Sequence, residues 1–204
     1  MVSLQGKIEF TNGVFELNNR NLTSLDTVTT DRTDITLPSY GIISNSCNIS
    51  FVDYFGDIEQ FIEEDLLTSD LKVELSIIDL ISKTTQSIGV FYTDKWSYDN
   101  NNKEVSVSLK DDLLEWQNIL LDRYISIYEK TFYELYEYLK SKTPTKFEFE
   151  ELDSETETFL KNTTCYFPHF SRGSLWSQFD KLCQIAYLHI RKNNSNKVVI
   201  KHEI

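Results

Sequence analysis

The sequence predicts an α+β fold in which a β-rich part precedes a helical part. Up to about residue 125, short segments alternate apolar and polar residues and are separated by turn residues, which is typical of half-buried strands. From Thr131 onward, the apolar residues recur with the spacing of an amphipathic helix. We therefore expect a β-rich domain over residues 1–125 and an α/β domain, with two amphipathic helices and a terminal hairpin, over residues 126–204.

Length and composition are those of a folded protein of one or two domains. The chain has 204 residues, of which 40% are hydrophobic and 13% aromatic. The formal net charge of −12 argues against a protein that coats nucleic acid or an anionic membrane, since both tasks require Lys and Arg to neutralise phosphates. The sequence contains neither a secretory signal nor an apolar run of about 20 residues, so no membrane segment is expected.

The first quarter of the chain predicts a hairpin, a loop, a strand and a short helix. An Asn-Gly pair at 12–13 is a tight-turn signal and predicts a hairpin over residues 7–17. Residues 18–32 are weakly hydrophobic and are expected to form a long loop. Alternation over residues 47–51 predicts a strand, and the acidic segment 57–67 is expected to form a surface helix.

A β unit follows, and it is the centre of the predicted first domain. Strands are expected over residues 71–77, 87–93 and 105–109, with an Asn-rich turn before the last of them. In the first strand, the residues expected to point inward are Leu71, Val73, Leu75 and Ile77. Asp111 and Asp112 then stand where acidic side chains favour the start of a short helix.

The second part reads as helix, loop, helix and hairpin. Thr131 with Glu134 is a capping-box signature for a helix that runs to Leu139. The acidic run DSETET is expected to form a loop. Ser174 is predicted to cap a second helix that ends near Ala186, and an Asn-rich turn then joins two strands. Because no element closes this hairpin, we expect that the domain continues beyond residue 204 or that its last strand pairs with another partner.

No pattern of residues indicates catalysis, a metal or a cofactor. Cys47, Cys165 and Cys183 are odd in number and widely spaced, so reduced and buried thiols are favoured over a disulfide framework. A metal site of Cys165, His169 and Cys183 is conceivable but would need a fourth ligand, and single packed or exposed residues are the favoured interpretation. We expect no enzyme activity and no cofactor.

Other candidate groups also have a simpler interpretation. Acidic pairs such as Glu63 with Glu64 are expected by chance in so acidic a chain, and capping explains Ser174 better than nucleophilic catalysis does. The three Trp residues could stack on sugars, but core and subunit contacts are the favoured interpretation. A chain with many aromatic residues and no catalytic constellation is typical of a component of an assembly.

The order of several short motifs resembles the N-terminal region of bacteriophage tail hub proteins, also called baseplate hub or tail-associated proteins. The segment 88–94 (IGVFYTD) is followed by 98–100 (YDN) and by the strand 105–109 (VSVSL), which leads to Asp111 or Asp112.

The second part matches in the same order. A Thr-started helix, the turn Tyr166-Phe167-Pro168, a helix over 174–186 and a strand–turn–strand over 187–200 follow one another. The resemblance covers most of residues 40–204, whereas the N-terminal arm and the segment 57–67 have no counterpart.

This resemblance implies a structural protein of the virion, made in the host cytoplasm and built into a phage tail. It implies a homotrimeric hub or adaptor ring between the tail tube and the tail tip, acting in host attachment and DNA ejection. The first domain would be a split, β-barrel-like tube domain with the helix-strand α/β domain inserted into it. The implied partners are other copies of the chain, a tail tube or distal tail protein, and tail tip or receptor-binding proteins.

An acidic chain suits a ring through which DNA passes without specific binding, because an acidic lumen repels phosphate. The residues that we expect at the lumen or at an interface are Glu74, Glu104, Asp57, Glu63, Glu64, Trp96 and Trp116. Two alternatives stay open at this point. One is the N-terminal part of a tail-associated cell-wall-degrading enzyme, and the other is a carbohydrate- or receptor-binding module of the virion.

Overall fold

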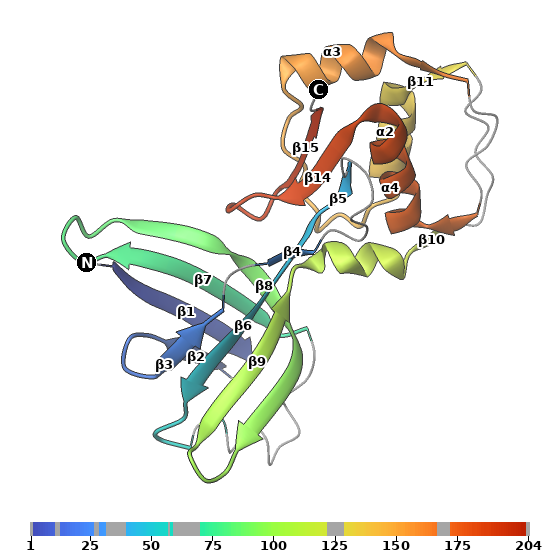
Figure 1. Cartoon of the computed structure of the whole chain (residues 1–204). Helices are drawn as coiled ribbons and strands as arrows, with labels where there is room; N and C mark the ends of the chain where they lie inside the picture. The colour runs from blue at the N-terminus through green and yellow to red at the C-terminus, as the bar shows by residue number, and fades with distance from the viewer. Residues whose placement is uncertain are drawn as a thin grey trace. The chain divides into compact units, whose positions relative to one another are not determined.

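The structure is a computed structural model that describes residues 2–10, 13–26, 29–31, 40–56, 58, 70–121, 129–166 and 172–202. The chain divides into two compact units (Figure 1). The first unit comprises Met1–Thr30 and Asn45–Asp111, and the second comprises Asp31–Ser44 and Asp112–Ile204. Residues 31–44 and 112–125 thus belong to the second compact unit, and the division into domains 1–125 and 126–204 stays a prediction.

The first unit is an antiparallel sheet of eight strands. The strands follow the order β2-β1-β7-β8-β9-β6-β3, and β4 also pairs with β6. Their bounds are β1 (Val2–Phe10), β2 (Gly13–Leu17), β3 (Leu22–Leu25), β4 (Thr29–Asp31), β6 (Ser44–Val52), β7 (Lys72–Asp79), β8 (Thr85–Asp99) and β9 (Glu104–Lys110).

One face of this sheet is apolar and forms the core of the first unit. Strand β9 shows the pattern: Val105, Val107 and Leu109 are buried and alternate with half-buried polar residues. The corresponding residues of the neighbouring strands, together with Ile58, complete the core, which contains Ile8, Phe10, Phe15, Leu17, Cys47, Ile49, Phe51, Ile58, Val73, Leu75 and Phe91.

The sheet curls around this apolar face into a half-barrel. Phe15 lies in β2 at one end of the strand order, and Phe51 lies in β6 near the other end. Their ring centroids are nevertheless only 5.1 Å apart, which requires the two ends of the sheet to bend toward each other. Within the described ranges β2 and β3 are not paired with each other, so the curl is held by side-chain packing.

Several of the predicted strands are confirmed. The β1–β2 hairpin has Phe10 opposite Gly13, and β6 and β9 contain the predicted alternating segments. The prediction for residues 18–32 as a long loop is wrong in part, because β3 and β4 lie within it. The predicted helix over residues 57–67 lies outside the described residues, apart from the fully buried Ile58.

Two predictions about the central strands are corrected. Ile77 is 36% exposed instead of buried, because its strand neighbours Leu4 and Gln86 lie outside the apolar core. Strand β8 is also longer than the predicted 87–93 and extends from Thr85 to Asp99, with a second register shift against β9.

The second unit combines a small sheet with helices. The sheet order is β15-β14-β5, where β5 (Gly41–Ile42) runs parallel to β14 (Leu188–Lys192) and β15 (Val198–His202) runs antiparallel to it. The helices are the 3₁₀ helix η1 (Asp112–Gln117), α2 (Phe132–Lys140), α3 (Ser154–Asn162) and α4 (Leu175–Ala186). Two short strand pairs, β10 (Leu120–Leu121) with β13 (Gly173–Ser174) and β11 (Lys130–Thr131) with β12 (Thr164–Cys165), complete it.

Helix capping explains where these helices begin. Thr131 and Glu134 form the predicted capping box of α2, and Ser174 accepts a hydrogen bond from the backbone N–H of Ser177 as the predicted cap of α4. The prediction of an acidic loop at DSETET is wrong, because this run starts α3. Asp153 accepts the N–H of Thr156 as N-cap, and Thr156 and Leu160 bury one side of the helix.

The core of the second unit is centred on Trp116. Its ring stacks on Phe179 at 4.8 Å between centroids and meets Phe147 edge-on at 5.5 Å. Leucines and other apolar residues from α2, α3, α4, β5, β14 and β15 surround these rings.

A buried ion pair joins the start of η1 to the end of β14. The Nζ of Lys192 lies 2.5 Å from Oδ1 of Asp112, and the two side chains are only 4% and 3% exposed. The same ammonium group donates to Oδ1 of Asn196 at 2.8 Å and lies over the ring of Phe147. Because these contacts replace the water that both charges lose, the pair is tolerated in the interior.

Removing one partner of this pair should destabilise the protein strongly. Asp112→Ala leaves a buried ammonium group without its counter-ion, so we expect the free energy of unfolding to fall by about 3–5 kcal/mol. Urea unfolding followed by circular dichroism measures this change. Lys197→Met, which breaks the exposed pair of Lys197 with Glu148, is the control and should have little effect. An equally small effect of Asp112→Ala would contradict the prediction, and Asp112→Leu combined with Lys192→Met should restore much of the stability.

Candidate functional site

The outer face of β1 and β7 carries a cluster of four alternating charges, which we call the charge ladder. It consists of Lys7, Glu9, Lys72 and Glu74, placed opposite one another by the β1–β7 register. Lys7 Nζ lies 2.9 Å from Glu9 and 3.0 Å from Glu74, and Lys72 Nζ lies 2.6 Å from Glu74 and 3.5 Å from Glu9. The two ammonium groups balance the two carboxylates, so Glu74 adds no net charge to this face.

These contacts move the pKa values of all four groups in the direction that favours the charged forms. The hydrogen bond from Lys7 lowers the pKa of Glu9, and that from Lys72 lowers the pKa of Glu74. The pKa of Lys7 is raised by its hydrogen bond to Glu9, and the pKa of Lys72 is raised by that to Glu74. Sequence reasoning assigned Glu74 to the outer face but missed the Lys partners, although the cross-strand spacing could have suggested them.

Glu104 lies on the outer face of β9, where the surface is polar but carries fewer charges. Its Oε1 is 3.5 Å from the hydroxyl of Thr23, and within the described part of the chain no ammonium or guanidinium group lies within ion-pair distance of it. Nearby, the hydroxyls of Ser50 and Ser106 are 2.8 Å apart across β6 and β9. Glu104 is therefore a carboxylate that can contribute to a negative surface.

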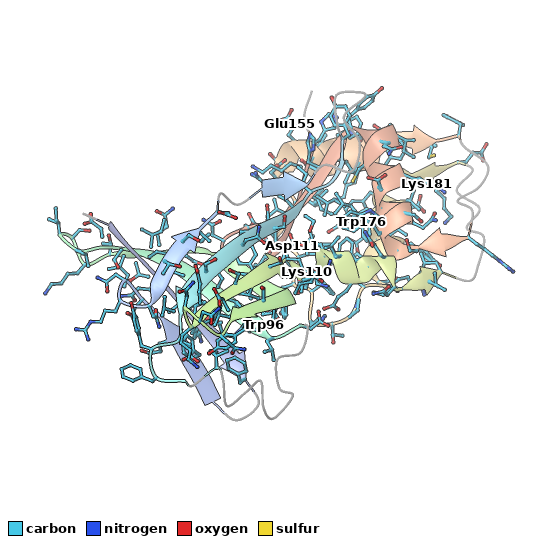
Figure 2. The ribbon with its side chains drawn as sticks, turned by 60° about the horizontal axis from the view of Figure 1, so that its bottom comes forward. Trp96, Lys110, Asp111, Glu155, Trp176 and Lys181 are labelled. Carbon is cyan, nitrogen blue, oxygen red and sulfur yellow. The ribbon has the colours of Figure 1, made fainter. Side chains whose placement is uncertain are left out.

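The other residues predicted to lie at the lumen or at an interface are not brought together with Glu74 and Glu104. Trp96 is half-buried against the core of the first unit, with its ring 6.3 Å from that of Phe10 (Figure 2). Trp116 is fully buried, so its ring is part of the core of the second unit and is not available at a surface. Asp57, Glu63 and Glu64 lie outside the described residues.

The thiols are buried and free, as predicted. Burial raises the pKa of Cys47 to about 11 and raises that of Cys183 well above its usual value, so both stay protonated. His169 lies outside the described residues, and the described ones contain no cluster of His, Cys, Asp and Glu that could hold a metal ion. Of the described helices, none is long and apolar enough to cross a membrane.

Asp111 has a structural contact that the sequence did not reveal. The predicted short helix starts one residue later, at Asp112. The Oδ2 of Asp111 accepts the backbone N–H of Asn45 at 2.6 Å, and its own N–H donates to the carbonyl of Asn45. Figure 2 shows Asp111 directly after Lys110, where β9 ends. The side chain therefore ties the end of β9 to the start of β6.

A shallow groove lies beside an unpaired part of β1 in the first unit. It has a volume of about 340 Å³ and is lined by Ser3 and Leu4 of β1, by residues 22–25 of β3 and by Leu80. The lining contains no charged residue. The groove is a place where an extended segment could lie along the sheet.

Comparison with known proteins finds similarity in structure and none in sequence. No known protein family matches the sequence, and no curated protein matches it. The fold is similar to the 43 kDa tail protein of prophage MuSo2 from Shewanella oneidensis, with a TM-score of 0.51, 9% identity, and 98% of this chain and 55% of that chain covered. A tail protein from Neisseria meningitidis MC58 gives a TM-score of 0.52 and 10% identity over 97% and 50% of the two chains.

A third similar structure is the half-lidded PdpA–VgrG complex of Francisella. The TM-score is 0.51 at 15% identity, with 98% of this chain and 30% of that chain covered. At these identities the similarity is one of fold. The chain spans about half the length of the two tail proteins.

The charge ladder predicts a specific dependence of stability on pH. Because the pKa values of Glu9 and Glu74 are lowered by folding, the stabilisation is present above their unfolded values, near 4.5, and is lost as pH falls through the folded values. Glu9→Gln combined with Glu74→Gln should therefore lower the urea midpoint slightly at neutral pH, by the small amount typical of exposed ion pairs.

The measurement is a series of urea titrations of this variant and the wild type from neutral to acidic pH. The difference between the two midpoints should shrink as the pH falls below 4.5 and should also shrink in high salt. A difference that is independent of pH would show that the ladder carboxylates do not act through their charge.

Proposed function

We propose that this chain is a structural component of a phage tail, part of a hub or adaptor ring between the tail tube and the tail tip. The observation that carries the proposal is the similarity of fold to two tail proteins over 97–98% of this chain. The order of motifs in the sequence supports the same assignment independently of the fold comparison. The first unit would be the tube-like domain and the second an insertion into it.

Other features of the molecule are consistent with a structural role. The described residues contain no metal-binding cluster, and both described cysteines of the second unit are buried. None of the three Trp side chains is exposed: Trp116 and Trp176 are buried and Trp96 is half-buried. A sugar-binding module needs exposed rings for stacking, so the Trp residues do not favour the carbohydrate-binding alternative.

In the proposed ring, DNA would pass through the lumen without specific binding. The net charge of −12 would repel phosphate. Because the charge ladder is neutral, the negative charge of the lumen would have to come from other carboxylates. Glu104 and the acidic residues Asp57, Glu63 and Glu64 are the candidates. Homotrimer formation, contact with a tail tube or distal tail protein, and contact with tip or receptor-binding proteins belong to the same proposal.

Imaging of intact particles tests the assignment directly. A chain carrying a small epitope tag at an exposed turn, such as Asn100, should be found as a ring at the junction of tube and tip. A position on the capsid, or absence from purified particles, would overturn the proposal. Purified protein should not release fragments from cell walls, and turnover in that assay would favour the enzyme alternative.

A charge-reversal experiment tests the acidic lumen. Glu63→Lys with Glu64→Lys should increase the affinity of the assembled protein for double-stranded DNA and give a steeper dependence on salt, because the added cations release counterions from DNA. Glu148→Lys with Glu151→Lys changes the net charge equally at two exposed positions of the second unit and is the matched control. Equal DNA affinity of the two variants would contradict a luminal role for Glu63 and Glu64.

A further inference from the structure

Three strands of the first unit extend past the rest of the sheet and form what we call the wing. It consists of the first half of β1, the end of β7 and the first half of β8, joined by the hairpin around Leu80 (Figure 1). Within the wing, Gln5 of β1 and Ser87 of β8 both lie opposite Ser76 of β7. The N-terminus lies beside the tip of this hairpin, as the pairing of Val2 with Asp79 requires.

Both outer edges of the wing lack a neighbouring strand among the described residues. Pairing of β1 with β2 begins only at Gly6, so Val2–Gln5 has β7 on one side and no strand on the other. Pairing of β8 with β9 begins only at Tyr92, so Thr85–Phe91 is in the same situation on the opposite edge. The β8 edge is exposed from Thr85 to Ser87, whereas on the β1 edge Ser3 is buried and Leu4 and Gln5 are half-buried. The backbone N–H and C=O groups on these edges have no partner strand among the described residues and can pair with another strand.

These two edges lack two of the features that usually protect an exposed strand, although a register shift at Ile88 interrupts the β8 edge. The segments VSLQ at 2–5 and TQSIGV at 85–90 contain no charged residue and no proline. This is unusual in a chain in which a quarter of the residues are charged and the net charge is −12. Two copies of so acidic a chain repel each other over most of their surface, and uncharged strips are where they can approach.

Apolar surface accompanies the two edges. Leu80 is 46% exposed and Ile81 is 81% exposed at the tip of the wing. Beside the free edge of β1 lies the uncharged groove between β1 and β3, with Leu80 at its rim. A strand arriving along β1 would cover this groove and the hydrophobic tip, which adds apolar burial to the backbone hydrogen bonds.

We propose that the wing is a self-association surface, in which the β8 edge (Thr85–Ile88) of one copy pairs with the β1 edge (Val2–Gln5) of the next. A second copy is the occupant because one chain carries both uncharged edges, each on its own side of the same wing. Two different surfaces that meet in this way form a head-to-tail contact, which closes into a ring when the rotation between copies allows it. The inference deepens the proposed function, on which it rests only for the ring.

Disulfide trapping tests the contact. Gln5→Cys combined with Ser87→Cys, and Gln5→Cys combined with Thr85→Cys, place one thiol on each edge in two neighbouring registers. Within one chain β7 separates these positions by two strand spacings, about 10 Å, which exceeds the roughly 7 Å that a disulfide can bridge. Any bond between the introduced thiols must therefore join different copies, and the three native cysteines are buried.

Under mild oxidation, at least one double variant should give covalent dimers and higher species, ending at a closed ring, on a non-reducing gel. Each single variant has one introduced thiol per copy, so its largest covalent species should be a dimer. Asn100→Cys with Ser195→Cys, at two exposed turns away from the edges, measures the background from random collision. Trapping no greater than this background in either register would overturn the proposal.

A second measurement does not depend on register. Thr85→Glu with Ser87→Glu adds two charges to the β8 edge at exposed positions, so the fold should be retained and the dissociation constant of the oligomer should rise about tenfold or more. Asn100→Glu with Ser195→Glu adds the same charge elsewhere and should leave the mass unchanged in light scattering. A wild type that stays monomeric, or an oligomer that the edge charges do not weaken, would overturn the wing contact.

The outcomes also separate this inference from the proposed function. If the oligomer forms despite the charges introduced at Thr85 and Ser87, and the protein is found at the tube–tip junction of particles, the proposed hub function stands and the wing contact is wrong. If disulfides form between copies through the wing but the protein is absent from tails, the wing contact stands and the proposed hub function is wrong.

Discussion

The contact between the rings of Phe15 and Phe51 is the point on which the shape of the first unit depends. These residues lie in strands separated by four others in the sheet order, and a flat sheet could not bring them to 5.1 Å. Their contact closes the apolar face on itself and removes it from water. Burial of that face supplies the driving force, and the register shifts in β8 and β3 let the sheet bend.

The curl has consequences for what the first unit can present to other molecules. Because the apolar residues face inward, the outer face is left to polar groups, and the charge ladder makes part of it neutral. Packing holds the curl without hydrogen bonds between β2 and β3 in the described chain, so edge groups of the sheet stay free. The edges at β1 and β8, and the groove beside β1, belong to a sheet whose two ends are not paired with each other in the described chain.

The second unit depends on a different interaction. Its aromatic core is built by residues from η1, α4 and the segment that carries Phe147, and the buried Lys192–Asp112 pair fixes the start of η1 against β14. Asp112 follows Asp111, whose carboxylate is committed to the backbone of Asn45 within the first unit. Two adjacent aspartates thus serve different units: Asp112 starts η1, as predicted, and Asp111 binds the backbone of Asn45.

Elements whose signals are local can be predicted from the amino-acid sequence. The β1–β2 hairpin, β9, and the capped starts of α2 and α4 follow from turn residues, alternation and capping residues, all within a few positions of one another. The α+β class and the likeness to tail proteins were also within reach of the sequence. The start of α3 was missed because an acidic run looks like a loop until Asp153 is seen to cap it.

The tertiary structure decided everything that depends on distant residues. The exposure of Ile77 comes from its position beyond the apolar core, the burial of Trp116 from rings far along the chain, and the neutrality of Glu74 from lysines on two strands. The free edges of the wing depend on where neighbouring strands start to pair. Such features are set by the balance of burial and hydrogen bonding over the whole sheet. They cannot be predicted from the alternation of residues along a single strand.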